Sequence, residues 1–204
     1  FCQLGEKREK SMSMNIVLLE PEMPANTGNI GRTCVATGTK LHLIKPLGFE
    51  ITDKMVKRAG LDYWPHLNYE VYENFEDFLE KNPDCIGKLY MATTKARHIY
   101  TEVAYEPDSY LMFGKESAGI PEEILVKYED YCMRIPMEYN IRSLNLSNSV
   151  AIVLYEASDS ISLRRWNCRG ICTDCIGTKS DENIKCFERA HAPSNSIGKT
   201  VRIS

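Results

Sequence analysis

Short apolar runs alternate along this chain with segments whose apolar residues have helical spacing. Strands are predicted at residues 15–20, 40–44, 88–93, 109–113 and 131–135. When helices connect successive strands, the strands run parallel and the helices cover both faces of the sheet. The sequence therefore predicts an α/β fold with a mostly parallel sheet and helices on both faces.

The first predicted helix, over residues 26–36, contains two glycines. Asn26 is expected to be its N-cap, and Gly38 is expected to end it. Gly28 and Gly31 each cost a helix about 1 kcal/mol relative to alanine, so we expect something to approach this backbone closely. Glycine serves both tight packing of elements and a ligand site, and the sequence leaves both explanations open. A second helix is predicted from Thr52 or Asp53 to Gly60 and carries Lys54, Lys57 and Arg58. Two more are predicted over residues 75–81, with Asn74 as the N-cap, and over residues 122–128.

Residues 135–155 join a polar loop to an apolar helix. One stripe at helical spacing is formed by Leu146, Val150, Val153, Leu154 and Ala157. Polar residues that can cap the first turn stand just before or within it, namely Ser143, Asn145, Ser147 and Asn148. The pattern fits a loop that holds a ligand, and it fits an ordinary capped helix equally well.

Three predicted strands run directly into glycine-rich or polar loops, after Thr93, Phe113 and Ile135. Open α/β sheets bind ligands at the carboxyl ends of their strands, so these loops predict a nucleotide-type pocket. There is no G-x-G-x-x-G fingerprint after the first strand and no Walker loop. A Rossmann dinucleotide enzyme and a P-loop nucleotidase are therefore not expected.

Composition predicts one domain with appendages in this chain of 204 residues. No apolar run approaches the roughly 18 residues of a membrane span, and the first residues lack the apolar region of a signal peptide. We therefore expect a cytoplasmic protein with no contact to a membrane. Residues 14–157 hold 14 Lys and Arg against 21 Asp and Glu, which argues against broad nucleic-acid binding and leaves room for a local basic patch.

The predicted domain covers residues 14–157, between an N-terminal extension, 1–13, and a tail, 158–204. The extension is expected to be disordered, and the tail to be disordered or foreign to the domain. Four cysteines gather in the tail, Cys168, Cys172, Cys175 and Cys186. Four thiols suffice for a zinc site, but their uneven spacing and weakly apolar flanks argue against one, and no metal is expected.

Three segments resemble, in order, the three motifs of the SPOUT RNA methyltransferases. They are residues 26–32, 113–121, and 135–137 with 142–148, and residues 58–63 and 93–95 fit the family too. The resemblance extends from Met14 to about Ala157 and is closest to the small single-domain tRNA 2′-O-methyltransferases. It implies transfer of a methyl group from S-adenosylmethionine to the ribose 2′-hydroxyl of the wobble nucleotide, a cytidine or a modified uridine.

The resemblance also implies features that composition does not indicate. The fold would contain a deep C-terminal trefoil knot, a feature that general folding rules treat as very rare. The protein would be a homodimer that acts on tRNA and binds S-adenosylmethionine in the knot. By position, the cofactor would contact Ala92, Thr93, Gly114, Glu116, Ile135, Met137, Ser143 and Leu144.

By the same resemblance, Arg32 is the catalytic residue nearest the reacting hydroxyl. A guanidinium loses its proton only above about pH 12, so we expect Arg32 to orient the hydroxyl or to stabilise developing negative charge. Asn26, Lys95 and Arg142 are expected to contact RNA or to orient Arg32.

Two other functions remain open from the sequence. A related enzyme of the family would methylate ribosomal RNA or another tRNA site. A non-catalytic adaptor would bind RNA or zinc through the cysteine-containing tail and would ignore S-adenosylmethionine.

Overall fold

The computed structural model describes residues 14–51 and 63–161. Within these ranges the chain forms a seven-stranded sheet with the order β3-β2-β1-β6-β4-β7-β5. All six pairings of neighbouring strands are parallel. The strands are β1 (Asn15–Leu19), β2 (Lys40–Ile44), β3 (Tyr69–Tyr72), β4 (Leu89–Ala92), β5 (His98–Ile99), β6 (Tyr110–Phe113) and β7 (Cys132–Arg134).

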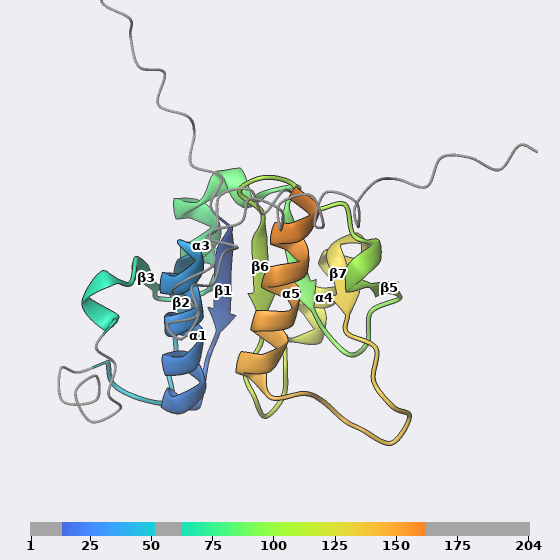
Figure 1. The fold of residues 1–204 in the computed structure, drawn as a ribbon, viewed down its shortest axis with the longest axis horizontal. Helices are drawn as coiled ribbons and strands as arrows, with labels where there is room; N and C mark the ends of the chain where they lie inside the picture. The colour runs from blue at the N-terminus through green and yellow to red at the C-terminus, as the bar shows by residue number, and fades with distance from the viewer. Residues whose placement is uncertain (1–13, 52–62, 162–204) are drawn as a thin grey trace, which may run out of the picture. The chain divides into compact units, whose positions relative to one another are not determined.

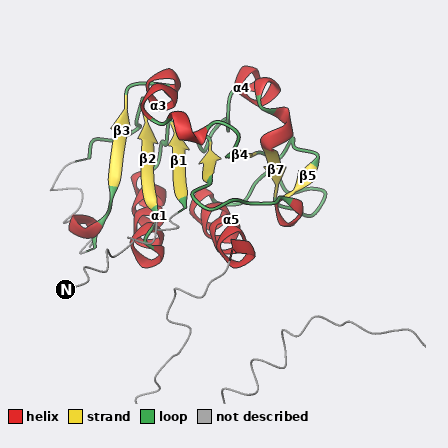
Figure 2. Ribbon diagram, turned by 90° about the horizontal axis from the view of Figure 1, so that it is seen from above, coloured by secondary structure: helices red, strands yellow, loops and turns green. Residues whose placement is uncertain are grey.

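Helices cover both faces of this sheet, as the sequence predicts. The helices are α1 (Pro24–Thr37), α3 (Phe75–Lys81), α4 (Glu122–Lys127) and α5 (Leu146–Ile161). Figure 1 shows α1 and α5 in front of the sheet. In the view from above, these two helices lie on one side of the strands, and α3 and α4 lie on the other (Figure 2). The described part of the chain contains no helix that is long and apolar enough to cross a membrane.

Strand β1 shows how the sheet separates two hydrophobic cores. It is buried along its whole length because it pairs with β2 on one side and β6 on the other. Ile16 and Leu18 point into the core shared with α1 and α5, whereas Val17 and Leu19 point into the core shared with α3 and α4. Successive side chains of a strand alternate between its faces, which explains why an unbroken apolar run is needed here.

Helix α1 begins two residues before the predicted start, so the prediction that Asn26 is its N-cap is wrong. Pro24 occupies the beginning of the helix, and Met23 is the N-cap, in extended conformation and without a side-chain cap bond. Proline suits the first helical turn because its missing N–H would have no partner there. The predicted end is confirmed, since Gly38 adopts the left-handed conformation with φ of 68°.

Helix α5 confirms the predicted apolar stripe. Val150, Val153, Leu154 and Ala157 are fully buried. The helix continues to Ile161, past the point at which the stripe and the predicted domain end.

Two strands were not predicted, β3 and β5. Strand β3 is half exposed and lies at one edge of the sheet, and β5 has two residues at the other edge. The predicted helix over 52–60 with Lys54, Lys57 and Arg58, the extension 1–13 and the four tail cysteines lie outside the described residues.

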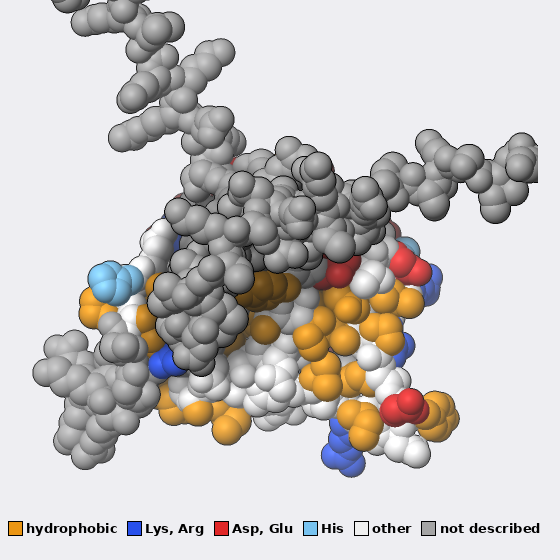
Figure 3. All heavy atoms as spheres, viewed as in Figure 1, with side chains coloured by type: hydrophobic (Ala, Val, Ile, Leu, Met, Phe, Trp, Pro, Cys, Tyr) orange, Lys and Arg blue, Asp and Glu red, His pale blue; other side chains and the backbone are white. Residues whose placement is uncertain are grey.

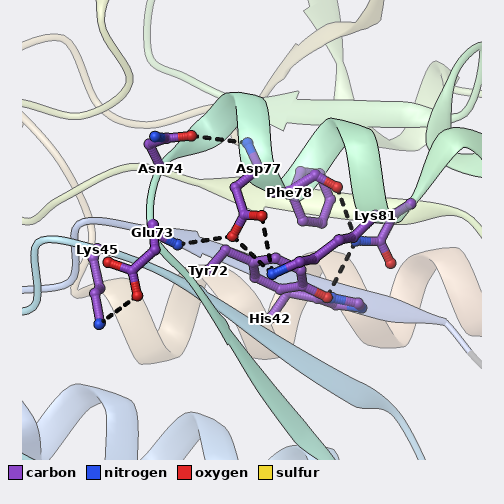
Figure 4. Close-up of polar contacts among 9 residues, drawn as sticks. His42, Lys45, Tyr72, Glu73, Asn74, Asp77, Phe78 and Lys81 are labelled. Carbon is purple, nitrogen blue, oxygen red and sulfur yellow. Dashed lines mark hydrogen bonds and ion pairs between the residues drawn. The ribbon is translucent and has the colours of Figure 1, made fainter.

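A buried polar chain crosses the α3 side of the sheet and ends at the backbone. His42 is fully buried, with Nδ1 2.8 Å from the Tyr72 hydroxyl and Nε2 3.2 Å from Asn15 Oδ1. Asn82 donates to the Tyr72 oxygen, and Asn15 donates to the Asp108 carbonyl. Nε2–H can donate to Asn15 Oδ1 while Nδ1 accepts from the Tyr72 hydroxyl, an arrangement that fits a neutral imidazole. Figure 4 shows His42 and Tyr72 beneath α3.

This neutral histidine predicts a loss of stability in mild acid. Burial, followed by the nearby charge of Lys40, lowers the pKa of His42 from 6.5 to about 3. The unfolded chain binds a proton here below about pH 6.5 and the folded chain does not, so stability falls as the pH drops from about 6.5 towards 3. Between pH 7 and pH 5 the free energy of unfolding is expected to fall by about 2 kcal/mol from this group.

Urea unfolding of wild type, His42→Gln and His66→Gln at pH 7 and pH 5 measures this effect. The pKa values of Glu22 and Glu70 are lowered from 4.5, and that of Asp77 from 3.8. These carboxylates therefore change the stability mainly below the measured pH range. His42→Gln should be less stable at pH 7 and should lose most of the pH dependence. His66→Gln, at an exposed position, should keep it. An unchanged slope in His42→Gln would refute the assignment.

Candidate active site

The three loops predicted to form a pocket leave the sheet side by side. Strands β6, β4 and β7 are neighbours, and the register pairs Ala92 with both Phe113 and Met133. The amide of Thr93 continues the ladder by donating to the Met133 carbonyl at 2.9 Å. The parallel strands therefore end at one level, and the chain after each of them enters the same region.

The loop after β6 is a tight turn that folds back on Gly114. Lys115 and Gly119 form an antiparallel bridge, with Gly119 N–H donating to the Lys115 carbonyl at 2.8 Å. A Cβ added at Gly114 would lie 2.1 Å from the carbonyl carbon of Gly119 and 2.2 Å from the nitrogen of Ile120. Only glycine fits this position, because backbone atoms occupy the space of any side chain.

The carboxylate of Glu116 holds this turn against the beginning of α1. It accepts hydrogen bonds from the amides of Glu22 at 2.8 Å and Met23 at 3.3 Å, and from the side-chain amide of Asn26 at 2.9 Å. Helix α1 lacks a cap from its own sequence, so Glu116 supplies the negative charge that a helix N-terminus favours.

Two further contacts bind the turn to the segment between β1 and α1. The carboxylate of Glu22 accepts from the amide and the hydroxyl of Ser117, each at 2.8 Å, and these bonds lower the pKa of Glu22. Lys115 donates to the carboxylate of Glu20 at 2.8 Å. Glu20 itself has a φ of 51°, uncommon outside glycine, at the point where the chain leaves β1.

Asn26 connects this turn to the beginning of α5. It is buried, and while its Nδ2 donates to Glu116, its Oδ1 accepts from Asn145 Nδ2 at 2.9 Å. The Oδ1 of Asn145 caps α5 by accepting from the amide of Ser147 at 2.9 Å. The predicted capping of α5 by this cluster is therefore confirmed, and Glu116, Asn26 and Asn145 form one network across three elements.

Asn145 offers a way to separate its two hydrogen-bonding roles. Asn145→Ala should lose both the cap of α5 and the bond to Asn26, and should destabilise the fold by about 1–2 kcal/mol. Asn145→Asp keeps an oxygen for the cap but replaces the donor that faces Asn26 Oδ1. Thermal unfolding should rank wild type above both variants; equal stability of Asn145→Ala and wild type would show that the network adds nothing.

Arg32 lies on α1, where its exposed side chain contacts Tyr63. The Arg32 Cζ atom is 4.9 Å from the centre of the Tyr63 ring. A Cβ added at the neighbouring Gly31 would lie 3.1 Å from Leu67 and 3.3 Å from Trp64. Packing of this segment on the helix thus explains Gly31 without a ligand.

The other predicted site residues divide into two groups. Ala92, Thr93 and Ile135 lie at the strand ends and are half buried. Met137, Arg142, Ser143 and Leu144 lie on the long loop between β7 and α5 (Figure 1). Lys95 pairs with Glu122 at the beginning of α4, at 2.5 Å. Both side chains are largely exposed, so this pair adds little stability.

Sequence reasoning missed the contacts of Glu20, Glu22 and Tyr63 at this site. Both carboxylates precede α1, and Lys115 and Ser117, their partners, are about 95 residues away. No periodicity connects positions so far apart. Tyr63 falls inside a segment that resembles the family, and this was its only signal.

Comparisons with known proteins agree with this geometry. The model of the SpoU rRNA methylase family matches residues 13–155. A curated protein of Listeria monocytogenes is 52% identical over 149 residues, which cover 72% of this chain and 87% of the relative. A protein of Methylovorus glucosotrophus named tRNA (cytidine(34)-2'-O)-methyltransferase is 46% identical over 144 residues, covering 70% of this chain and 92% of the relative.

A solved structure described as "Structural insights into the 2-OH methylation of C/U34 on tRNA" has a TM-score of 0.66 and 41% identity. It covers 71% of this chain and 93% of that chain. A crystal structure from Bacillus anthracis has a TM-score of 0.73 and 46% identity, covering 78% of this chain and all of that one. The chain belongs to the SpoU rRNA methylase family, the family of RNA methyltransferases that its three motifs resemble.

Proposed function

We propose that this chain transfers a methyl group from S-adenosylmethionine to the ribose 2′-hydroxyl of the wobble nucleotide of tRNA. The main observation behind the proposal is that Glu116 and Asn26 connect the strand-end loops to α1, the helix that carries Arg32. The names of relatives that share 44–52% of their residues with this chain support the tRNA wobble position.

The residues at the strand ends fit a cofactor that carries a flat base. Ile135 and Met137 are half buried and Leu144 is 37% exposed, so apolar surface remains available to cover an adenine. Ala92, Thr93 and Gly114 would contribute small groups and backbone at the strand ends, and Ser143 a hydroxyl. Glu116 would act on the cofactor through the turn, because its carboxylate binds the beginning of α1.

When bound, S-adenosylmethionine supplies a methyl group on a sulfonium that is activated for displacement by an oxygen nucleophile. Arg32 would hold the ribose hydroxyl in line and stabilise the negative charge that develops on it. A guanidinium remains protonated near neutral pH, so the hydroxyl proton leaves to another acceptor, such as an RNA phosphate or water. Lys95 and Arg142 would contact the RNA, Lys95 by exchanging Glu122 for a phosphate.

The proposal includes the knot and the homodimer. Strand β7 follows β6 in the sequence but lies beyond β4 in the sheet, which supports a connection that crosses over β4. Figure 3 shows hydrophobic side chains on the face of the molecule that carries α1 and α5. Among the exposed apolar residues, Met23 is 50% exposed, and Ile152 and Tyr155 of α5 are 37% and 48% exposed. A second copy would cover them. Sedimentation equilibrium that found only monomer would refute the dimer.

The domain, predicted over residues 14–157, would extend to Ile161 with the end of α5, and its substrate would place it in the cytoplasm, with tRNA. The experiment is transfer of labelled methyl from S-adenosylmethionine to tRNA that lacks its wobble methylation, followed by nuclease mapping of the label. Label at the ribose of nucleotide 34 is expected. Because the family is described by rRNA methylation, ribosomal RNA serves as a parallel substrate. Label on ribosomal RNA alone would replace the tRNA proposal, and no label with no cofactor binding would favour the adaptor.

A further inference from the structure

We propose that Tyr63 is a positioning residue that holds the guanidinium of Arg32 for methyl transfer, an inference that rests on the proposed function. The Arg32 Cζ atom lies 4.9 Å from the centre of the Tyr63 ring. The face of an aromatic ring attracts a cation, and a guanidinium can stack on it because it is planar. This contact restricts a long side chain that otherwise samples many rotamers.

Tyr63 is bonded to the same turn of helix that carries Arg32. Its hydroxyl donates a hydrogen bond to the backbone carbonyl of Gly28. In an α-helix this carbonyl also accepts from the amide four residues later, which is that of Arg32. The ring is therefore fixed relative to the backbone of Arg32 at one point and contacts the end of its side chain at another.

The segment that carries Tyr63 is anchored independently of Arg32. Trp64 and Leu67 are buried in the core that α1 shares with the sheet, and they pack against Gly31. A Cβ at Gly31 would crowd the two anchors, since it would lie 3.1 Å from Leu67 and 3.3 Å from Trp64. The position of the ring is thus set by packing, and the ring in turn limits where the guanidinium can lie.

The arrangement suits a group that must stabilise charge on a substrate oxygen. A ring on one face of the guanidinium removes water there, and a guanidinium donates hydrogen bonds in its own plane. Preorganisation of this kind acts on the transition state, so it raises kcat more than it lowers KM. A tyrosine that instead stacked on an RNA base would act mainly on RNA binding.

Three variants distinguish these roles in the methyl-transfer assay. Tyr63→Leu removes the ring and should lower kcat about five- to tenfold, with KM for tRNA changed less than about twofold. Tyr63→Phe keeps the ring and should keep most of the activity. Tyr128→Leu is the matched control, since Tyr128 is half buried and contacts the ring of Phe75 on the opposite side of the sheet. It should resemble wild type.

The double variant Arg32→Ala/Tyr63→Leu tests whether Tyr63 acts through Arg32. In single turnover with excess enzyme, it should be no slower than Arg32→Ala alone. Losses that multiply, a rise in KM without a fall in kcat, or a Tyr63→Leu variant as active as wild type would each overturn the proposal.

A second readout does not depend on activity. The ring current of Tyr63 should shift the NMR signals of the Arg32 Cδ protons and Nε–H upfield in the wild-type protein, and Tyr63→Leu should remove this shift. If the shift is present but no RNA is methylated, the proposed function fails while the contact stands. If the shift is absent in wild type, Tyr63 does not position Arg32, whatever the activity.

Discussion

Gly114→Ala is expected to disrupt the turn after β6, destabilising the fold by about 3 kcal/mol or more and abolishing cofactor binding. The new methyl group would lie 2.1 Å from the Gly119 carbonyl carbon and 2.2 Å from the Ile120 nitrogen. Both are backbone atoms, which cannot turn aside as a side chain can. The turn would have to open, and the hydrogen bonds of Glu116 and Ser117 to the beginning of α1 would be lost with it.

Gly119→Ala is the matched control within the same turn. Gly119 has a φ of 73°, but a Cβ there would meet no atom within 4 Å. Only the cost of the left-handed conformation applies, about 1–2 kcal/mol, and the turn should persist. Urea unfolding and calorimetric titration with S-adenosylmethionine measure both effects. If Gly114→Ala kept wild-type stability and lost only cofactor binding, Gly114 would serve the ligand and the turn would tolerate a side chain.

Local signals in the sequence predicted most of the sheet, the bounds of α3 and the end of α1. Asn74 caps α3 through the Asp77 amide as expected, and strand β2 has its predicted bounds (Figure 4 shows the cap). These features depend on residues within a few positions of each other, where capping and periodicity act. The edge strand β3 was missed because its partly exposed residues, such as Glu70, lack a continuous apolar run.

The cap of α1 could not be predicted from local signals. Asn26 has the residue type of a cap and lies in the first turn of the helix, yet the N-cap is Met23, and the carboxylate beside this helix end comes from Glu116, about 90 residues later. Pro24 moved the start of the helix, which freed the Asn26 amide to bond on both sides. Tertiary structure determines which groups bond to a carboxylate, and a single sequence does not indicate partners so far apart in the chain.

The fold class could be predicted from periodicity, whereas the roles of the site residues depended on the family resemblance. Periodicity placed three loops at one edge of the sheet, and the order β6-β4-β7 confirms that they are neighbours. The resemblance alone assigned roles to Arg32, Lys95 and Arg142, and these assignments remain predictions. The structure adds the hydrogen bonds of Glu116, Asn26 and Asn145, which connect these loops to the helices.

Arg32→Ala is expected to lower kcat for tRNA methylation about 100- to 1000-fold, the loss typical when a group that stabilises transition-state charge is removed. The side chain is exposed on α1 and contacts Tyr63, so its removal should leave the stability of the fold within about 1 kcal/mol of wild type. Cofactor affinity, measured by titration, should be unchanged, because the cofactor residues lie on other elements. Arg32→Lys keeps the positive charge but loses the planar guanidinium, so its kcat should lie between those of wild type and Arg32→Ala.

Lys81→Ala is the control for loss of a positive charge. Lys81 lies on α3, on the opposite face of the sheet, where it pairs with Asp77 at 2.9 Å. Its removal should leave methylation unchanged, whereas a general effect of net charge on tRNA binding would slow both variants alike. An Arg32→Ala variant with normal kcat and a raised KM would show that Arg32 binds RNA without taking part in catalysis. A normal kcat and a normal KM would mean that the catalytic centre lies elsewhere among the strand-end loops, since the network of Glu116, Asn26 and Asn145 connects those loops without requiring Arg32.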